Sequence, residues 1–321
     1  MSRTLVATSP LSTGDIVGRS FRIFRQNLLL ICKSLLLPTI IICLGRISVL
    51  VGVSYGAKFV NNLSSGIAWI TLAAVGSVVA IVGLAMLWIK QLVLVRYLTG
   101  IDDTFEQAQN FVKGRILSLI LLFIVALLAT VFAMLLWAVV MVLSFPPLQG
   151  QGLSPVFGSL GMAVGIFGLL FSAIFISLVY NLVGIGLTLE KGDLGDLIGE
   201  GFALTVRSFW RSIGFLTMTS ASVAVVAYPL SLPMIMIMIG FLVVQGAALG
   251  SNPDAALPVW LQVVNSVWET AVNMVIGPIY YLAYALYYRD LRMRQEGLDI
   301  VERLNEVDKA DNSGRLSTHG I

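Results

Sequence analysis

Polar side chains suited to chemistry recur on one face of an apolar run that spans residues 257–288. Gln262, Asn265, Glu269 and Asn273 follow one another at spacings of three, four and four, so on a helix they share one face. We call these four residues the polar ladder. Glu269 is the only acidic residue in any long apolar run, and a carboxylate in hydrocarbon needs a partner or a water-filled cavity. The ladder is therefore interpreted either as interhelical hydrogen bonding or as a ligand or ion site.

Arg46, in the first apolar run, is the predicted partner of Glu269. Asn27 and Arg46 are 19 residues apart, and so are Glu269 and Tyr288. Each interval corresponds to about 28 Å of helix rise from the predicted cytoplasmic end. The two charges can therefore meet at one depth, and we predict an ion pair between Arg46 and Glu269.

The residues needed for common catalytic or metal sites are scarce. The one histidine, His319, lies close to the C-terminus, and both cysteines, Cys32 and Cys43, lie in the first apolar run. A histidine-based general base or zinc site cannot be assembled from them. No phosphate-binding or dinucleotide-binding fingerprint occurs. We expect no catalytic residue, no metal, no cofactor and no nucleic-acid partner.

The composition identifies the class of protein that must position the ladder. The chain has 321 residues, of which 58% are hydrophobic and 12% charged, whereas soluble domains carry about 25% charged residues. Apolar runs near 28–53, 67–97, 116–143, 156–187, 211–245 and 258–288 predict about six membrane-spanning helices. Pro229 and Pro233 predict that the fifth is kinked or broken. Gly161, Gly165, Gly168 and Ser172 form a small-residue stripe that predicts close helix packing in the fourth.

Basic residues gather in alternate connections and at both ends of the chain. Basic residues precede the first run and follow the second, the fourth and the last run. The other connections contain a single basic residue, Lys58. Because positive charge accumulates on the cytoplasmic side, both termini are predicted to be cytoplasmic. The expected location is a bacterial plasma (inner) membrane, with another internal membrane as the alternative.

Short amphipathic segments precede the first, third and fifth runs and begin near Asp15, Asp102 and Asp196. The first is a basic amphipathic helix of the kind that lies in the membrane interface, with three arginines on its polar side, Arg19, Arg22 and Arg25. Each segment leads into two spans, which predicts hairpin repeats over 14–99, 101–188 and 195–289. We expect a mobile lead at 1–11, one all-α membrane domain at 12–304 and a disordered cytoplasmic tail at 305–321.

The two ends of this domain resemble a known family. LSTGDIVGRSFRIFRQNLLLI at 11–31 and LYYRDLRMRQEGLDI at 286–300 are similar to the opening and closing motifs of polytopic proteins related to the glycerophosphoryl diester phosphodiesterase membrane domain. The resemblance implies a helical membrane bundle whose biochemical role is largely unassigned. It does not imply a phosphodiesterase, because the catalytic barrel is absent.

The sequence favours a non-catalytic membrane accessory or scaffold that binds membrane protein partners, a second copy of itself or anionic lipids. The residues expected to contact lipid or a partner are basic and lie near predicted cytoplasmic ends: Arg19, Arg22, Arg25, Lys33, Lys90, Arg289, Arg292 and Arg294. The alternative is a carrier for a lipid or small solute with a pathway near Glu269. A cavity that reaches Glu269 would favour the carrier, and a dry, fully paired Glu269 would favour the scaffold.

Overall fold

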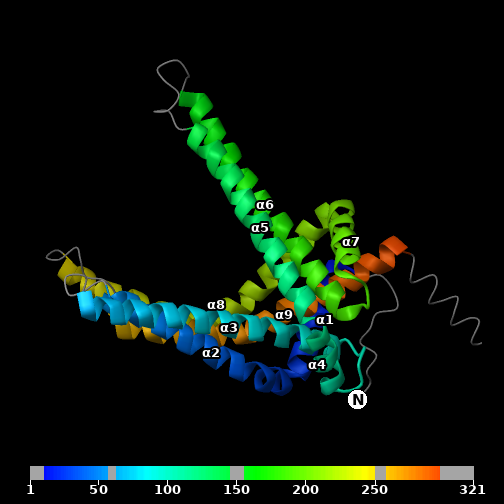
Figure 1. Cartoon of the computed structure of the whole chain (residues 1–321), viewed down its shortest axis with the longest axis horizontal. Helices are drawn as coiled ribbons and strands as arrows, with labels where there is room; N and C mark the ends of the chain where they lie inside the picture. Colours follow the sequence, from blue (N-terminus) through cyan, green and yellow to red (C-terminus); the bar gives the residue numbers. More distant parts are fainter. Residues whose placement is uncertain (1–10, 57–62, 145–154, 250–257, 297–321) are drawn as a thin grey trace, which may run out of the picture. The chain divides into compact units, whose positions relative to one another are not determined.

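The computed structural model describes residues 11–56, 63–144, 155–249 and 258–296, which are helical and contain no strand. Along the chain, a short helix followed by two long helices occurs three times (Figure 1). In chain order they are α1 (Thr13–Gln26), α2 (Leu28–Gly56), α3 (Leu63–Leu98), α4 (Phe105–Gly114), α5 (Ile116–Leu143), α6 (Pro155–Leu189), α7 (Leu194–Arg207), α8 (Phe209–Leu249) and α9 (Val259–Glu296). The predicted lead, apart from Leu11, and the predicted tail lie outside the described residues.

Five helices in the described residues are long and apolar enough to cross a membrane, which indicates an integral membrane protein. These are α2, α3, α5, α6 and α8. The sixth predicted span, α9, is not among them, because the polar ladder and five tyrosines lower its mean hydropathy. The prolines at 229 and 233 lie inside one continuous helix, α8, rather than between two separate helices.

The chain divides into two compact units. One, here called the ladder unit, contains residues 11–105 and 215–286; the other, the α7 unit, contains the described residues of 106–214 and 287–296. The boundaries fall inside α8 and α9, so neither unit is one continuous stretch of chain. The single membrane domain over 12–304 and the three hairpin repeats stay predictions.

The N-terminus of α1 is closed by a capping box. Ser12 is the N-cap, its hydroxyl accepts a 3.2 Å hydrogen bond from the Asp15 amide, and the Ser12 amide donates to the Asp15 carboxylate. The Ser12 hydroxyl also donates to that carboxylate at 2.6 Å. These bonds favour the ionised form and lower the pKa of Asp15. The apolar face of α1, which includes Ile16 and Ile23, is buried, whereas Arg22 and Arg25 are exposed.

Within the ladder unit, α2 and α3 pack along a row of glycines, here called the glycine seam: Gly45, Gly52, Gly76 and Gly83. A methyl group added at Gly76 would lie 2.7 Å from the Ser48 Cβ, and one added at Gly45 would collide with the backbone of Ala80. Only glycine allows the two backbones to approach this closely. Because Arg46 follows Gly45, the seam also fixes the direction in which the Arg46 side chain leaves α2.

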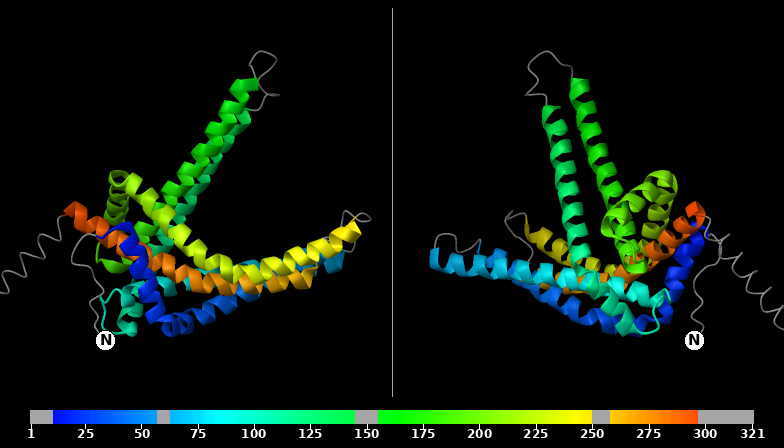
Figure 2. Two further views of the ribbon diagram at one scale, coloured as in Figure 1. Left: turned by 180° about the vertical axis from the view of Figure 1, so that it is seen from behind. Right: turned by 45° about the vertical axis from the view of Figure 1, so that its right-hand side comes forward.

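Within the α7 unit, α5 and α6 lie side by side (Figure 2). The predicted small-residue stripe on α6 faces bulky side chains of α5: Gly165 meets Met141, and Gly168 meets Trp137. The Trp137 indole N–H donates a 2.9 Å hydrogen bond to the Ser172 hydroxyl. The close packing predicted for this stripe is confirmed, and it lies within the protein.

Candidate functional site

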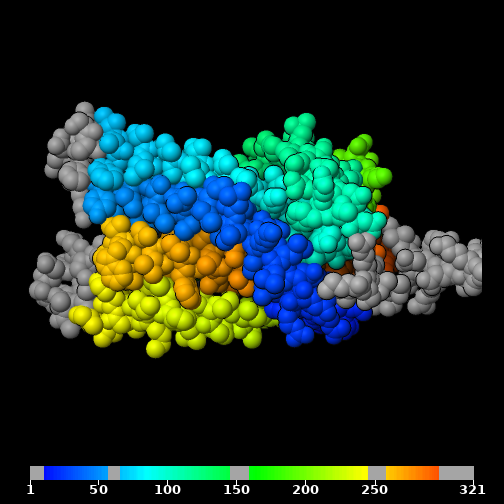
Figure 3. Space-filling view, turned by 90° about the horizontal axis from the view of Figure 1, so that it is seen from below, coloured from blue at the N-terminus to red at the C-terminus, as the bar shows by residue number. Residues whose placement is uncertain are grey.

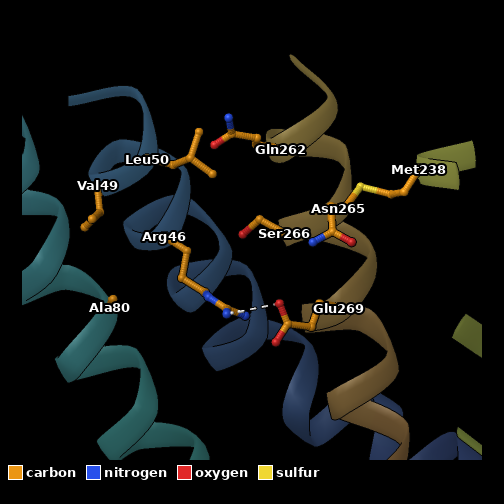
Figure 4. A pocket seen from close by; sticks show the side chains of 9 residues that line it. All are labelled: Arg46, Val49, Leu50, Ala80, Met238, Gln262, Asn265, Ser266 and Glu269. Carbon is orange, nitrogen blue, oxygen red and sulfur yellow. Dashed lines mark hydrogen bonds and ion pairs between the residues drawn. The ribbon is translucent and has the colours of Figure 1, made fainter. Parts of the chain in front are cut away.

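Three of the four residues of the polar ladder line a pocket in the ladder unit, where α9 lies between α2 and α8 (Figure 3). The pocket has a volume of about 590 Å³, within the range of roughly 300–1,000 Å³ typical of ligand sites. We call it the ladder pocket. Its lining residues come from four helices (Figure 4): Arg46, Val49, Leu50, Ala80, Met238, Gln262, Asn265, Ser266 and Glu269.

The predicted contact between Arg46 and Glu269 is present. An Arg46 guanidinium nitrogen lies 3.2 Å from a Glu269 carboxylate oxygen, and the two side chains are 40% and 50% exposed. A second guanidinium nitrogen donates to the Thr270 hydroxyl at 3.4 Å, and that hydroxyl in turn donates to the Ser266 carbonyl at 2.6 Å. The pair is therefore oriented by a buried hydroxyl but remains accessible from the pocket.

Helical register explains why these groups meet. Arg46 lies ten residues before the end of α2, and Glu269 lies ten residues after the start of α9. Both side chains are thus about 15 Å along their helices from those ends. Because the two residues lie at equal distances from these helix ends, their side chains can meet directly.

A second pocket, of about 250 Å³, lies between α8 and α9 and shares Asn265 and Glu269 with the first. Of these two pockets, Asn273 lines the second but not the ladder pocket, and Gln262 lines the ladder pocket but not the second. The Trp268 indole N–H on α9 donates a 2.9 Å hydrogen bond to the Leu230 carbonyl on α8, which links the two helices beside this pocket. The ladder is therefore divided between two pockets, with Glu269 and Asn265 in the wall that both share.

A third pocket lies on α1 and the start of α2 and is lined by Gly18, Phe21, Arg22, Phe24, Arg25 and Leu28. Its volume is about 460 Å³. Arg22 and Arg25 are exposed beside apolar side chains, and Leu29 next to the pocket is 87% exposed. Lys33 is also exposed on α2. We call this area the basic α1 surface.

The other predicted lipid-contact or partner-contact residues have different surroundings. Arg19 is half-buried and lies near Asp15. The Lys90 ammonium lies 5.7 Å from the centre of the Phe105 ring. Arg289 is half-buried in the last turns of α9.

Arg292 and Arg294 form ion pairs inside the α7 unit. Arg292 lies 2.6 Å from Glu200 and 3.3 Å from Glu190, and Tyr288 donates a hydrogen bond to Glu190. Glu190 and Glu200 are therefore both ion-pair partners of Arg292, and both carboxylates remain partly exposed. These pairs already balance part of the positive charge that was expected to face lipid.

Sequence reasoning missed three polar residues that the structure places in such networks. Ser266 and Thr270 are buried on α9. Gln262, Ser266 and Thr270 are spaced four residues apart, so the helical periodicity that predicted the ladder could also have predicted these two residues. Asp290 is fully buried and pairs with both Arg211 and Arg294. Its partner Arg211 is 79 residues away in the chain, so no local pattern signals this pair.

Across the described residues, no group of three or more histidine, cysteine or acidic side chains could hold a metal ion. Comparison with family models, with curated proteins and with solved structures finds no match for this chain. The fold and the site define its class, a helical integral membrane protein with an ion-paired pocket.

Proposed function

We propose that this protein binds a lipid or small solute in the ladder pocket and carries it across or within the membrane. The supporting observation is the ladder pocket itself, which reaches the half-exposed pair of Arg46 and Glu269. A pair whose only task was to join α2 to α9 would be expected to be dry, because water access weakens the attraction. The accessible pair favours the carrier over the scaffold that the sequence put first.

In this proposal α9 is a sixth span, both termini are cytoplasmic and the protein resides in a bacterial inner membrane. The glycine seam supplies a firm wall, because α2 and α3 touch along their backbones. The contact of α9 with α8 uses side chains instead, including the aromatic pair Phe241 and Trp260, whose ring centres are 6.3 Å apart. Side chains can change rotamer more readily than backbones can separate, so α9 is the wall best able to move.

The test is native mass spectrometry of the full chain, extracted gently from its own membrane, beside a Glu269→Gln variant. We expect a ligand mass on the wild type that is lost or strongly reduced on the variant. Asn273→Leu, which changes only the second pocket, is the matched control and should retain the ligand. A wild-type protein that carries no ligand, or a ligand that Glu269→Gln leaves in place, contradicts the proposal.

A second candidate is the scaffold that binds anionic lipid, and the observation that favours it is the basic α1 surface. Two exposed arginines beside apolar side chains suit a headgroup phosphate with its adjoining acyl chains. Retention of phosphatidylglycerol by the purified protein should fall in an Arg22→Gln/Arg25→Gln double variant. Arg19→Gln, on the same helix but outside the pocket, is the control. Equal loss in both would attribute binding to net charge rather than to this surface.

Membership of the family resembled at 11–31 and 286–300 is also a proposal, supported by those two motifs. A non-catalytic role is proposed together with it. Purified protein that hydrolysed glycerophosphodiesters would overturn that part.

A further inference from the structure

We propose that the ligand of the ladder pocket is zwitterionic, with one anionic and one cationic group. The inference rests on the proposed binding function and names the chemical class of the ligand. Among the residues that line the ladder pocket, Arg46 and Glu269 are the ionisable ones, so the lining carries one charge of each sign. The second pocket adds no further ionisable side chain to Glu269.

Charge balance selects the ligand. A ligand that enters between Arg46 and Glu269 separates them, and an uncompensated charge within a membrane bundle is strongly disfavoured. An anionic ligand pairs with Arg46 and leaves Glu269 without a counter-charge, and a cationic ligand does the reverse. A ligand with both charges replaces one ion pair with two.

The neutral groups around the pair suit the same chemistry. In the described part of the chain the side-chain amide of Asn265, which lines the ladder pocket, makes no hydrogen bond, so it offers donors and an acceptor to a ligand. The lining also includes three apolar side chains, those of Val49, Leu50 and Met238. This surface can hold an alkyl chain, as in a phosphoethanolamine lipid, or the short aliphatic part of a free zwitterion such as an amino acid.

Substitutions of Arg46 and of Glu269 should shift the preference for the charge of the ligand in opposite directions. Glu269→Gln leaves one positive charge in the pocket and should favour an anionic ligand. Arg46→Gln leaves one negative charge and should favour a cationic one. The exchange Arg46→Glu/Glu269→Arg keeps one charge of each sign and should keep the zwitterion preference, which separates charge balance from a general failure to fold.

The experiment is competition binding measured by native mass spectrometry on the full chain in detergent. All variants carry Arg22→Gln and Arg25→Gln, so that anionic lipid does not bind at the basic α1 surface. The probes are phosphatidylethanolamine, phosphatidylglycerol and a dialkyl quaternary ammonium lipid, with free phosphoethanolamine and free alanine as soluble competitors. Displacement by a soluble competitor indicates a solute ligand, and retention against both indicates a lipid.

The expected result is at least about tenfold preference for the zwitterionic probe over each singly charged lipid, with the preference moved toward anions by Glu269→Gln. The reference protein carries Arg22→Gln and Arg25→Gln alone. If it bound phosphatidylglycerol as tightly as phosphatidylethanolamine, or more tightly, the inference would be overturned and the proposed function would stand. A preference that Glu269→Gln does not change would also overturn it. Absence of any bound probe would overturn both.

Discussion

The ion pair of Arg46 and Glu269 should contribute a measurable coupling free energy to stability. At the observed 3.2 Å, the gross attraction is about 5 kcal/mol for an effective dielectric constant of about 20. The side chains are 40% and 50% exposed, so solvent and side-chain ordering remove most of this attraction. We expect a net coupling of about 1–2 kcal/mol, between the values typical of exposed and buried pairs.

A double-mutant cycle measures this coupling. Arg46→Gln, Glu269→Gln and the double variant are unfolded by increasing sodium dodecyl sulfate in mixed micelles, with tryptophan fluorescence as the signal. The double variant should lose less stability than the sum of the two single losses, by the coupling energy. Lys33→Gln combined with Glu269→Gln is the control, because Lys33 lies on the same helix as Arg46 and is exposed.

Two outcomes would refute this reasoning. Additivity of Arg46→Gln and Glu269→Gln within about 0.3 kcal/mol would show that the contact contributes nothing. A coupling equal to that of the Lys33 control would show a diffuse charge effect rather than a specific pair.

Three further changes probe other parts of the structure. Asp290→Asn should destabilise the protein by about 3 kcal/mol in thermal unfolding, because it leaves two arginines without their fully buried partner; a loss below about 1 kcal/mol contradicts this. Gly76→Val should cost about 1–3 kcal/mol by overpacking against Ser48, whereas Gly240→Val, with open space around it, should cost less. The pKa of Asp15 is lowered on folding, so its contribution is present at neutral pH and lost as the pH falls through that lowered value. Asp15→Asn should remove this part of the acid sensitivity, and an unchanged pH profile would contradict it.

Sequence reasoning located the long helices and one contact between them. The apolar runs predict helices because a membrane span must satisfy its own backbone hydrogen bonds. The pair of Arg46 and Glu269 could be predicted because both are isolated charges in apolar runs. The same number of residues separates each of them from the predicted cytoplasmic end of its helix, which places them at equal depth. The same reasoning overestimated the apolar character of α9, whose tyrosines and amides leave it outside the five helices apolar enough to cross a membrane.

The rest depends on tertiary packing. The division of the ladder into two pockets follows from the rotation of α9 between α2 and α8, which residue spacing along one helix does not determine. Arg292 pairs with Glu190 and with Glu200, which lie 102 and 92 positions earlier in the chain. A surface-like carboxylate and an ion-pair partner have the same appearance in sequence, and only the fold distinguishes Glu190 in its network from a solvated side chain.

The long sequence separation of Arg46 and Glu269 has a consequence for biogenesis. The two residues are 223 positions apart, so during synthesis Arg46 is complete long before its counter-charge has left the ribosome. The glycine seam joins α2 to the helix that follows it, and this local pair can form early. Arg46 therefore remains without this counter-charge until α9 has been synthesised. A chain that ended before α9 would leave Arg46 without this counter-charge, which is unfavourable within a membrane bundle.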